Sequence, residues 1–259
     1  MTSPVLLAVP NLSEGRDPAL VRELADHPAL LDVHIDPDHN RSVLTYGGPP
    51  DVVGDACLSL VSRAVARLDL RAHEGVHPRN GVVDVLPIVP FRAEVADAER
   101  LAGHLAREIT TQHGVTVHRY GADDLPALRR GLRGTSGHPT AGVVSVGVRG
   151  PLIAFNVNAR GTLEGAREVA SEVRRIPAVR ALGFELPSRG LVQVSMNLTD
   201  PSITGPREAY GAVTARAATH GLSPVEAEVV GLVPEVFLVE IEGLPMAGPV
   251  RSVEAALRG

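Results

Sequence analysis

The alternation of apolar and polar positions along the chain predicts a mixed α/β protein whose elements follow one order in the first half. Short apolar runs typical of strands lie at residues 5–9, 30–35, 42–46 and 82–89. Apolar positions at helical spacing lie at residues 18–27 and 50–68. The resulting order is β-α-β-β-α-β, the ferredoxin-like unit. A further helix at residues 93–113 and a strand at 115–120 are predicted to extend it.

The second half repeats this order after a segment rich in glycine, arginine and aspartate at residues 123–139. Strands are predicted at residues 152–157, 179–185, 191–198 and 228–233, and helices at 162–174 and 206–220. We therefore expect an α/β (α+β) fold of two tandem ferredoxin-like βαββαβ subdomains that face each other across a ligand cleft. The expected division is residues 1–122, a connector and loop at 123–150, and residues 151–259. For residues 234–259 no element is predicted.

Composition narrows the classes of function. The 259 residues, 44% of them hydrophobic, are enough for one large domain or two ordinary ones, and no apolar run is long enough to span a membrane. Residues 1–10 lack the basic flank of a signal peptide. A net charge of −5 and 3% aromatic residues argue against nucleic acid as a partner. The single cysteine, Cys57, permits no internal disulfide and fits a cytoplasmic protein; on an apolar helix face it is expected in the core.

All 25 basic residues are arginine, because the chain contains no lysine. This excludes Schiff-base chemistry on a lysine and the lysine of a Walker A phosphate loop. Anionic ligands must then be held by arginine, by backbone N–H groups or by helix N-termini.

The segment at residues 71–85 concentrates chemistry on a loop that leads into an apolar strand. Pro78 and the pair Asn80-Gly81 prevent a continuous helix there. A histidine such as His77 can accept a proton in one step of a reaction and return it in the next. His73 precedes it by four residues, but without a helix and a third ligand no metal site is predicted.

Three other loops carry candidate binding residues. The turn at residues 36–41 is either a solvated hairpin or a carboxylate site in which Asn40 and Arg41 take part. The loop at residues 9–17 is either an anion site or a structural helix cap. The glycine-rich segment at residues 133–142 lacks the lysine of a phosphate loop and is a candidate ligand lid.

Several strings, in this order, resemble the glutamate formimidoyltransferase family. In the first half they are V-P-N-L-S-E-G at residues 9–15, L-L-D-V at 30–33, N-R at 40–41 and H-E-G-V-H-P-R-N-G at 73–81. In the second half they are L-I-A-F-N at residues 152–156, Q-V-S-M-N at 193–197 and V-G-L-V-P at 230–234. The resemblance covers the chain from about residue 8 to residue 234.

The resemblance implies two α/β subdomains and transfer of the formimino group of N-formimino-L-glutamate to tetrahydrofolate, the co-substrate, in histidine breakdown. It implies that His77 is the catalytic acid and base. We expect the substrate to be bound by Arg79, Arg41, Asn40 and Asn11. The segment at residues 133–142 looks like the folate-contacting loop of the family, and the folate-contacting residues expected there are Gly137, His138, Pro139, Thr140 and Gly142. The expected partners are small molecules, with neither nucleic acid nor membrane. Family members are often dimeric, so a homodimer is one state open to this chain.

Four departures from the family pattern keep alternatives open. His34 and Val76 stand where the family often carries acids, Ala141 stands where an aromatic residue is usual, and the connector after Tyr120 is short. One alternative is a non-catalytic protein that binds folate or a small anion on the same scaffold. Another is a related folate-dependent enzyme with a different amidine or formyl donor.

Overall fold

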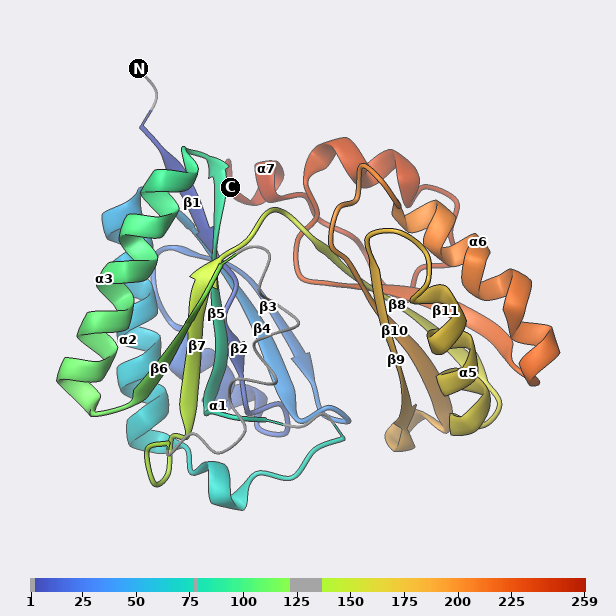
Figure 1. Cartoon of the computed structure of the whole chain (residues 1–259), viewed down its shortest axis with the longest axis horizontal. Coiled ribbons are helices and arrows are strands. Elements are labelled where there is room, and N and C mark those ends of the chain that lie inside the picture. Colours follow the sequence, from blue (N-terminus) through green and yellow to red (C-terminus); the bar gives the residue numbers. More distant parts are fainter. Residues whose placement is uncertain (1–2, 77–78, 122–136) are drawn as a thin grey trace. The chain divides into compact units, whose positions relative to one another are not determined.

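The computed structural model describes residues 3–76, 79–121 and 137–259 (Figure 1). The chain divides into two compact units, Met1–Gly150 and Pro151–Gly259. Each unit contains one sheet with helices, which confirms the mixed α/β class and the two-subdomain organisation. Within the described residues, no helix combines the length and the apolar character needed to cross a membrane.

In the part of the first unit that the structure describes, the sheet has seven strands. They are β1 (Val5–Ala8), β2 (Asn11–Leu12), β3 (Leu30–Asp36), β4 (Arg41–Gly48), β5 (Val83–Arg92), β6 (Thr116–Tyr120) and β7 (Val143–Val148). Both β1 and β2 pair with β4 on one side and with β5 on the other, so they act as one interrupted strand. Strand β3 lies outside β4, and all these pairings are antiparallel. Beyond β5, strands β7 and β6 continue the sheet in parallel.

Strand β7 comes from residues that the sequence assigns to a connector. Every residue of Val143–Val148 is buried, so the strand lacks the alternation that marks a strand with one solvated face. It lies between β5 and β6. Gly147 permits this close approach, because a Cβ at that position would lie 2.2 Å from the carbonyl oxygen of Tyr120. The first sheet is therefore larger than a βαββαβ unit with one added strand.

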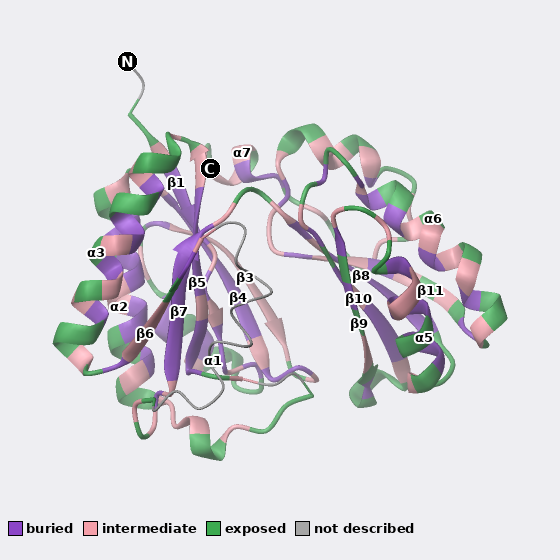
Figure 2. Cartoon of the chain, in the orientation of Figure 1, coloured by how far each residue is buried: buried purple, intermediate pink, exposed green. Residues whose placement is uncertain are grey.

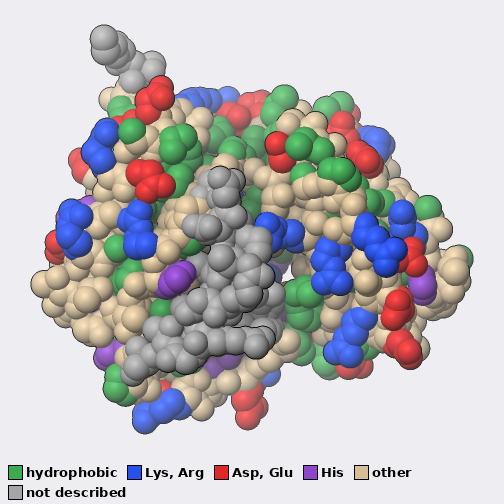
Figure 3. All heavy atoms as spheres, viewed as in Figure 1, with side chains coloured by type: hydrophobic (Ala, Val, Ile, Leu, Met, Phe, Trp, Pro, Cys, Tyr) green, Lys and Arg blue, Asp and Glu red, His purple; other side chains and the backbone are tan. Residues whose placement is uncertain are grey.

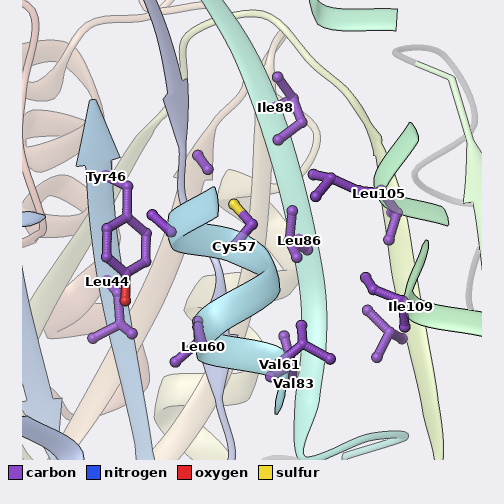
Figure 4. Close-up of a cluster of buried hydrophobic side chains, with 14 of the residues drawn as sticks. Leu44, Tyr46, Cys57, Leu60, Val61, Val83, Leu86, Ile88, Leu105 and Ile109 are labelled. Atoms are coloured by element: carbon purple, nitrogen blue, oxygen red, sulfur yellow. The ribbon is translucent and has the colours of Figure 1, made fainter. Parts of the chain in front are cut away.

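Within the described residues, the α-helices of the first unit are α1 (Pro18–Ala25), α2 (Pro50–Arg67) and α3 (Val95–His113). Asp17 caps α1 by accepting hydrogen bonds of 3.0 Å from the N–H groups of Ala19 and Leu20. The core under α2 and α3 is drawn in Figure 4, where leucine, isoleucine and valine side chains of the helices meet those of the sheet. Cys57 is fully buried in it, and burial raises the pKa of its thiol. It is therefore a core residue, as the sequence predicts.

The second unit has four strands and two main helices. In chain order they are β8 (Ile153–Arg160), α5 (Leu163–Val173), β9 (Val179–Leu186), β10 (Leu191–Leu198), α6 (Pro206–Ala217) and β11 (Ser223–Val230). The antiparallel sheet has the order β11-β8-β10-β9. Each β-α-β connection therefore skips over one strand, because β10 separates β8 from β9 and β8 separates β10 from β11. Figure 2 shows the buried positions following the strands of both sheets.

Strand β11 begins five residues before its predicted start at residue 228. Its second residue, Pro224, argues against a central strand, but β11 lies at the edge of the sheet, where a missing N–H donor is tolerated. A register shift between Pro224 and Glu226 accommodates the change. The short helices outside the sheets are η1 (Leu70–Ala72), η2 (Pro187–Arg189), η3 (Ala218–His220), η4 (Glu235–Glu240) and α7 (Val253–Ala256).

A pair of substitutions in α2 tests this account of the first core. Leu60 is 1% exposed and Val52 on the same helix is 37% exposed. We expect Leu60→Ala to lower the free energy of unfolding by about 2–5 kcal/mol, because it removes buried methyl groups and leaves a cavity. Val52→Ala, the matched control, should change it by less than about 1 kcal/mol. Urea unfolding followed by circular dichroism measures both, and equal effects would contradict the burial of this helix face.

Candidate functional site

Four loops are tied together beside the first sheet: the loop after β2, the β3–β4 turn, the loop before β5 and the turn before β7. The hydroxyl of Ser13 donates to the carbonyl of Gly81 at 2.7 Å, which joins the first loop to the third. The N–H of Val82 donates to the carbonyl of Ala141 at 2.9 Å, which joins the third to the fourth. Three of the four loops contain the family-like strings of the first half of the chain, so the structure gathers motifs that are distant in sequence.

Asn40 is the centre of these connections. It is 6% exposed and has a φ of 45°, a left-handed conformation that asparagine adopts more readily than most residues. Its Oδ1 accepts from the N–H of Gly15 at 3.0 Å, and its Nδ2 donates to the carbonyl of Glu74 at 2.8 Å. Nδ2 also lies 3.4 Å from Nδ1 of His73. Both ends of the side chain are thus engaged, so Asn40 positions the loops.

Two motif glycines allow these loops to approach. A Cβ on Gly15 would lie 2.3 Å from the carbonyl oxygen of Asp36 and 2.4 Å from the backbone nitrogen of Arg41. A Cβ on Gly75 would lie 2.6 Å from the carbonyl oxygen of His39. Backbone atoms cannot give way as the end of a side chain can, so both positions require glycine.

Arg79 is a buried cation, and two of its nitrogens donate no hydrogen bond to the described residues. Its side chain is 3% exposed, and its Nη1 donates to Oδ2 of Asp84 at 3.3 Å. Oδ1 of Asp84 accepts from the N–H of Asn80 at 2.9 Å, which fixes the carboxylate. Nε and Nη2 of Arg79 have no hydrogen-bond partner among the described residues. A guanidinium in this state matches the two oxygens of a carboxylate.

The electrostatic surroundings of Arg79 favour an anion. Burial, and next the positive charge of Arg41, lower the pKa of Arg79 to about 10, so it stays protonated at neutral pH. Asp84 and Asp36 oppose this shift. Charged side chains of both signs are intermixed on the molecular surface (Figure 3), where water screens them. The buried Arg79 lacks that screening, and a bound carboxylate would compensate part of its charge.

Two histidines beside Arg79 were not selected from the sequence. His39 is fully buried in the β3–β4 turn, and burial lowers its pKa to about 4. Burial and the charge of Arg79 also lower the pKa of His73. The turn at residues 36–41 is therefore not a solvated hairpin. Its string of polar residues gives no signal of this, because the burial results from packing against a loop more than 30 residues away.

The turn before β7 contains the predicted folate-contacting residues. The backbones of His138 and Gly142 exchange two hydrogen bonds of 2.9 Å, and Nδ1 of His138 accepts from the N–H of Ala141 at 3.1 Å. Gly142 has a φ of 70°, and a Cβ there would lie 2.1 Å from the carbonyl oxygen of Asn80. His138 and Gly142 thus shape the turn, as does Gly137, whose Cβ would meet Gly142. Pro139 is exposed and Thr140 is half-buried, so these two remain accessible.

The remaining predicted site residues are placed as follows. His77 lies outside the described residues. Asn11 is half-buried in β2, where its Nδ2 donates to the carbonyl of Val9 at 3.4 Å. Arg41 is half-buried at the start of β4, opposite Asp36. Within the described part of the chain, no group of three or more histidine, cysteine or acidic side chains could hold a metal ion.

Both halves of the chain match models of one domain family. Residues 5–136 match the N-terminal subdomain of the formiminotransferase domain, and residues 153–243 match the formiminotransferase domain. The chain is 34% identical to the glutamate formimidoyltransferase of Thermoplasma acidophilum, with 90% of this chain and 89% of the relative aligned. It is 29% identical to the glutamate formimidoyltransferase of Streptococcus pyogenes, over 92% and 91% of the two chains. The formimidoyltransferase-cyclodeaminase of Sus scrofa is 33% identical, and the chain spans about half its length, 50%.

The buried His39 predicts how stability depends on pH. Burial is the largest influence on the pKa of His39 and lowers it, and the charges of Arg41 and Arg79 act in the same direction. Asp36 and Asp38 oppose them, and the resulting pKa is about 4. Between pH 6.5 and about 4 the unfolded chain binds a proton that the native chain does not, so the free energy of unfolding falls as the pH falls. We expect this contribution to be on the order of 1–3 kcal/mol between pH 7 and pH 4.5.

The measurement is urea unfolding at several pH values in this window. His39→Gln should flatten the dependence, whereas His104→Gln, at an exposed position on α3, should leave it unchanged. An equally steep dependence in His39→Gln would show that other groups carry it.

Proposed function

The chain belongs to the formiminotransferase family, and we propose on this premise that it transfers the formimino group of N-formimino-L-glutamate to tetrahydrofolate. The observation that carries the proposal is Arg79, a buried guanidinium in the H-E-G-V-H-P-R string of the family, two of whose nitrogens have no partner among the described residues. A group of this kind suits a substrate with carboxylates, and N-formimino-L-glutamate has two.

Arg79 and Arg41 are proposed to hold the carboxylates of the donor. Asp84 restrains Arg79 at one nitrogen and leaves Nε and Nη2 for the ligand. The hydrogen bonds of Asn40 to Gly15 and Glu74 connect the turn that leads into Arg41 with the two neighbouring loops before a substrate arrives. Holding the donor rigidly beside the acceptor converts an encounter of two molecules into a reaction within one complex, which supplies much of the rate.

His77 is proposed to move the proton. N5 of tetrahydrofolate attacks the amidine carbon of the donor, and a new C–N bond forms. His77 takes the proton from N5 and delivers it to the nitrogen of glutamate as the old C–N bond breaks. Glutamate and 5-formimino-tetrahydrofolate are the products, so atoms and charge balance without an additional reactant.

Folate is proposed to contact the turn before β7. Pro139 and Thr140 offer an accessible apolar and hydroxyl surface on a turn whose shape is fixed by His138 and Gly142. Asn11 is proposed to contribute from β2. A cytoplasmic location and a homodimer remain expectations from the sequence.

Substitution of His77 tests the chemical step. We expect His77→Ala to lower kcat for transfer from formiminoglutamate to tetrahydrofolate by about 10²–10⁴-fold, the usual contribution of general acid-base catalysis. His104→Ala, at an exposed position of α3, is the matched histidine control and should retain full activity. Steady-state formation of the folate product is the measurement. Unchanged kcat in His77→Ala would exclude this histidine as the proton carrier, and tetrahydrofolate binding without turnover in the native protein would favour a binding protein.

Substitution of Arg79 tests the carboxylate site. We expect Arg79→Met to raise KM for formiminoglutamate by about 10–100-fold, because hydrogen bonds to a charged group contribute about 1.5–3 kcal/mol. The change in kcat should be smaller. Arg100→Met on α3, whose side chain is 71% exposed, is the control for loss of one positive charge. If Arg79→Met folds normally by circular dichroism and keeps its KM, the donor is held elsewhere.

A further inference from the structure

The sheet of the second unit presents two different faces. Strand alternation turns Phe155 and Val157 of β8 into the core beneath α5 and α6 (Figure 1). It turns the neighbouring Asn156 and Asn158 to the opposite face. Gln193 on β10 lies opposite Asn158, and on the other side of β8 the residue paired with Asn158 is Glu226. A row of amide and carboxylate side chains thus crosses three strands on the face that these helices do not cover.

Hydrogen bonds link this row to the neighbouring row on the same face, which contains the paired residues Asn156 and Glu228. Asn158 Nδ2 donates to Oε1 of Glu226 at 3.0 Å, and Asn156 Nδ2 donates to Oε2 of Glu228 at 3.1 Å. Gln193 Nε2 donates to Oδ1 of Asn158 at 3.0 Å and approaches Oε2 of Glu228 at 3.4 Å. The amide nitrogens of Asn156, Asn158 and Gln193 are therefore directed toward acceptors within the network.

Gln193 provides the independent sign of a ligand. The residue is 1% exposed, and its Oε1 has no hydrogen-bond partner among the described residues. Its amide cannot simply be reversed, because Nε2 faces two acceptor oxygens, one on Asn158 and one on Glu228. A buried acceptor without a donor costs free energy, so such a group is expected to have a role.

Hydrogen bonds favour the charged form of the Glu226 carboxylate. Burial raises the pKa of Glu226, but hydrogen bonds from Arg189 and Asn158 outweigh it, and the net pKa is lowered. Arg189 also forms an ion pair with Glu226. The network therefore combines negative charge with an unsatisfied neutral acceptor, which is the complement of a group rich in N–H donors.

We infer that Gln193 Oε1, beside the carboxylate of Glu228, accepts hydrogen bonds from the N–H donors of a planar N–C–N group. Given the proposed function, on which the identity of the ligand rests, two sources carry this group. One is the formamidine of the donor substrate, and the other is the aminopyrimidinone edge of folate. Gln193 is then a substrate-binding residue of the second unit, with Asn156 and Asn158 as positioning residues.

The test uses the full chain and two small probes, acetamidine for the amidine and 2-amino-4-hydroxypyrimidine for the aminopyrimidinone. Binding is measured by calorimetry and by the shift of the Gln193 side-chain amide signal in NMR spectra. We expect Gln193→Met to weaken binding of at least one probe by about tenfold, the value of one hydrogen bond. Asn197→Met, an exposed position on the same face of β10, is the matched control and should bind as the native chain does.

The results of these experiments either overturn the inference or identify the group that is bound at Gln193. The inference is overturned if the native chain binds neither probe, if binding leaves the Gln193 signal unmoved, or if a folded Gln193→Met binds normally. If Gln193→Met does not fold, the NMR shift in the native chain decides. In the transfer assay, a KM of Gln193→Met that rises for formiminoglutamate alone identifies the formamidine as the group bound at Gln193. A KM that rises for tetrahydrofolate alone identifies the aminopyrimidinone. Probe binding without any transfer activity would defeat the proposed function and leave this inference standing.

Discussion

The burial of one guanidinium is the constraint on which the candidate site depends. Removing a charge from water is costly unless partners replace the water, and in the described part of the chain Arg79 has Asp84 at one of its three nitrogens and no partner at the other two. The surrounding loops must therefore be fixed strongly enough to keep the group where it is. The hydrogen bonds of Asn40 with Gly15 and Glu74, and the backbone hydrogen bond that Val82 donates to Ala141, supply that rigidity. The site is thus prepared before a ligand binds, which lowers the entropy that binding must overcome.

The two units use the same physical scheme for different surfaces. In each, helices cover one face of a sheet with apolar side chains, and the chemistry lies on loops or strands away from that core. The first unit collects cations, Arg79 and Arg41, on loops at a sheet end. The second collects acceptors, with Gln193 and Glu228 on adjacent parts of one sheet face. Complementary chemistry of this kind suits a pair of substrates in which one part is anionic and another is rich in N–H donors.

The periodicity of apolar residues predicted most of the fold. The sequences of α2, α3, β8 and β10 have a clear apolar pattern, and the structure has the expected element at each of these places. The periodicity did not identify β7, because a strand buried on both sides has no alternation, or the early start of β11, because Pro224 is read as a breaker. For the site, the residue types and spacing of the H-E-G-V-H-P-R string were sufficient to select Arg79. The engagement of Asn40 in loop contacts, the burial of His39 and the open acceptor of Gln193 depend on residues far away in sequence. The facing arrangement of the two halves stays a prediction.

The buried thiol of Cys57 can report on opening of the core of the first unit. It is the only cysteine, it is fully buried under α2, and its raised pKa keeps it in the unreactive protonated form. Thiol-specific reagents can therefore modify Cys57 only while the core of the first unit is open. The rate of modification in the native buffer would follow the opening of that unit by itself, without an introduced label, while the second unit contributes no signal.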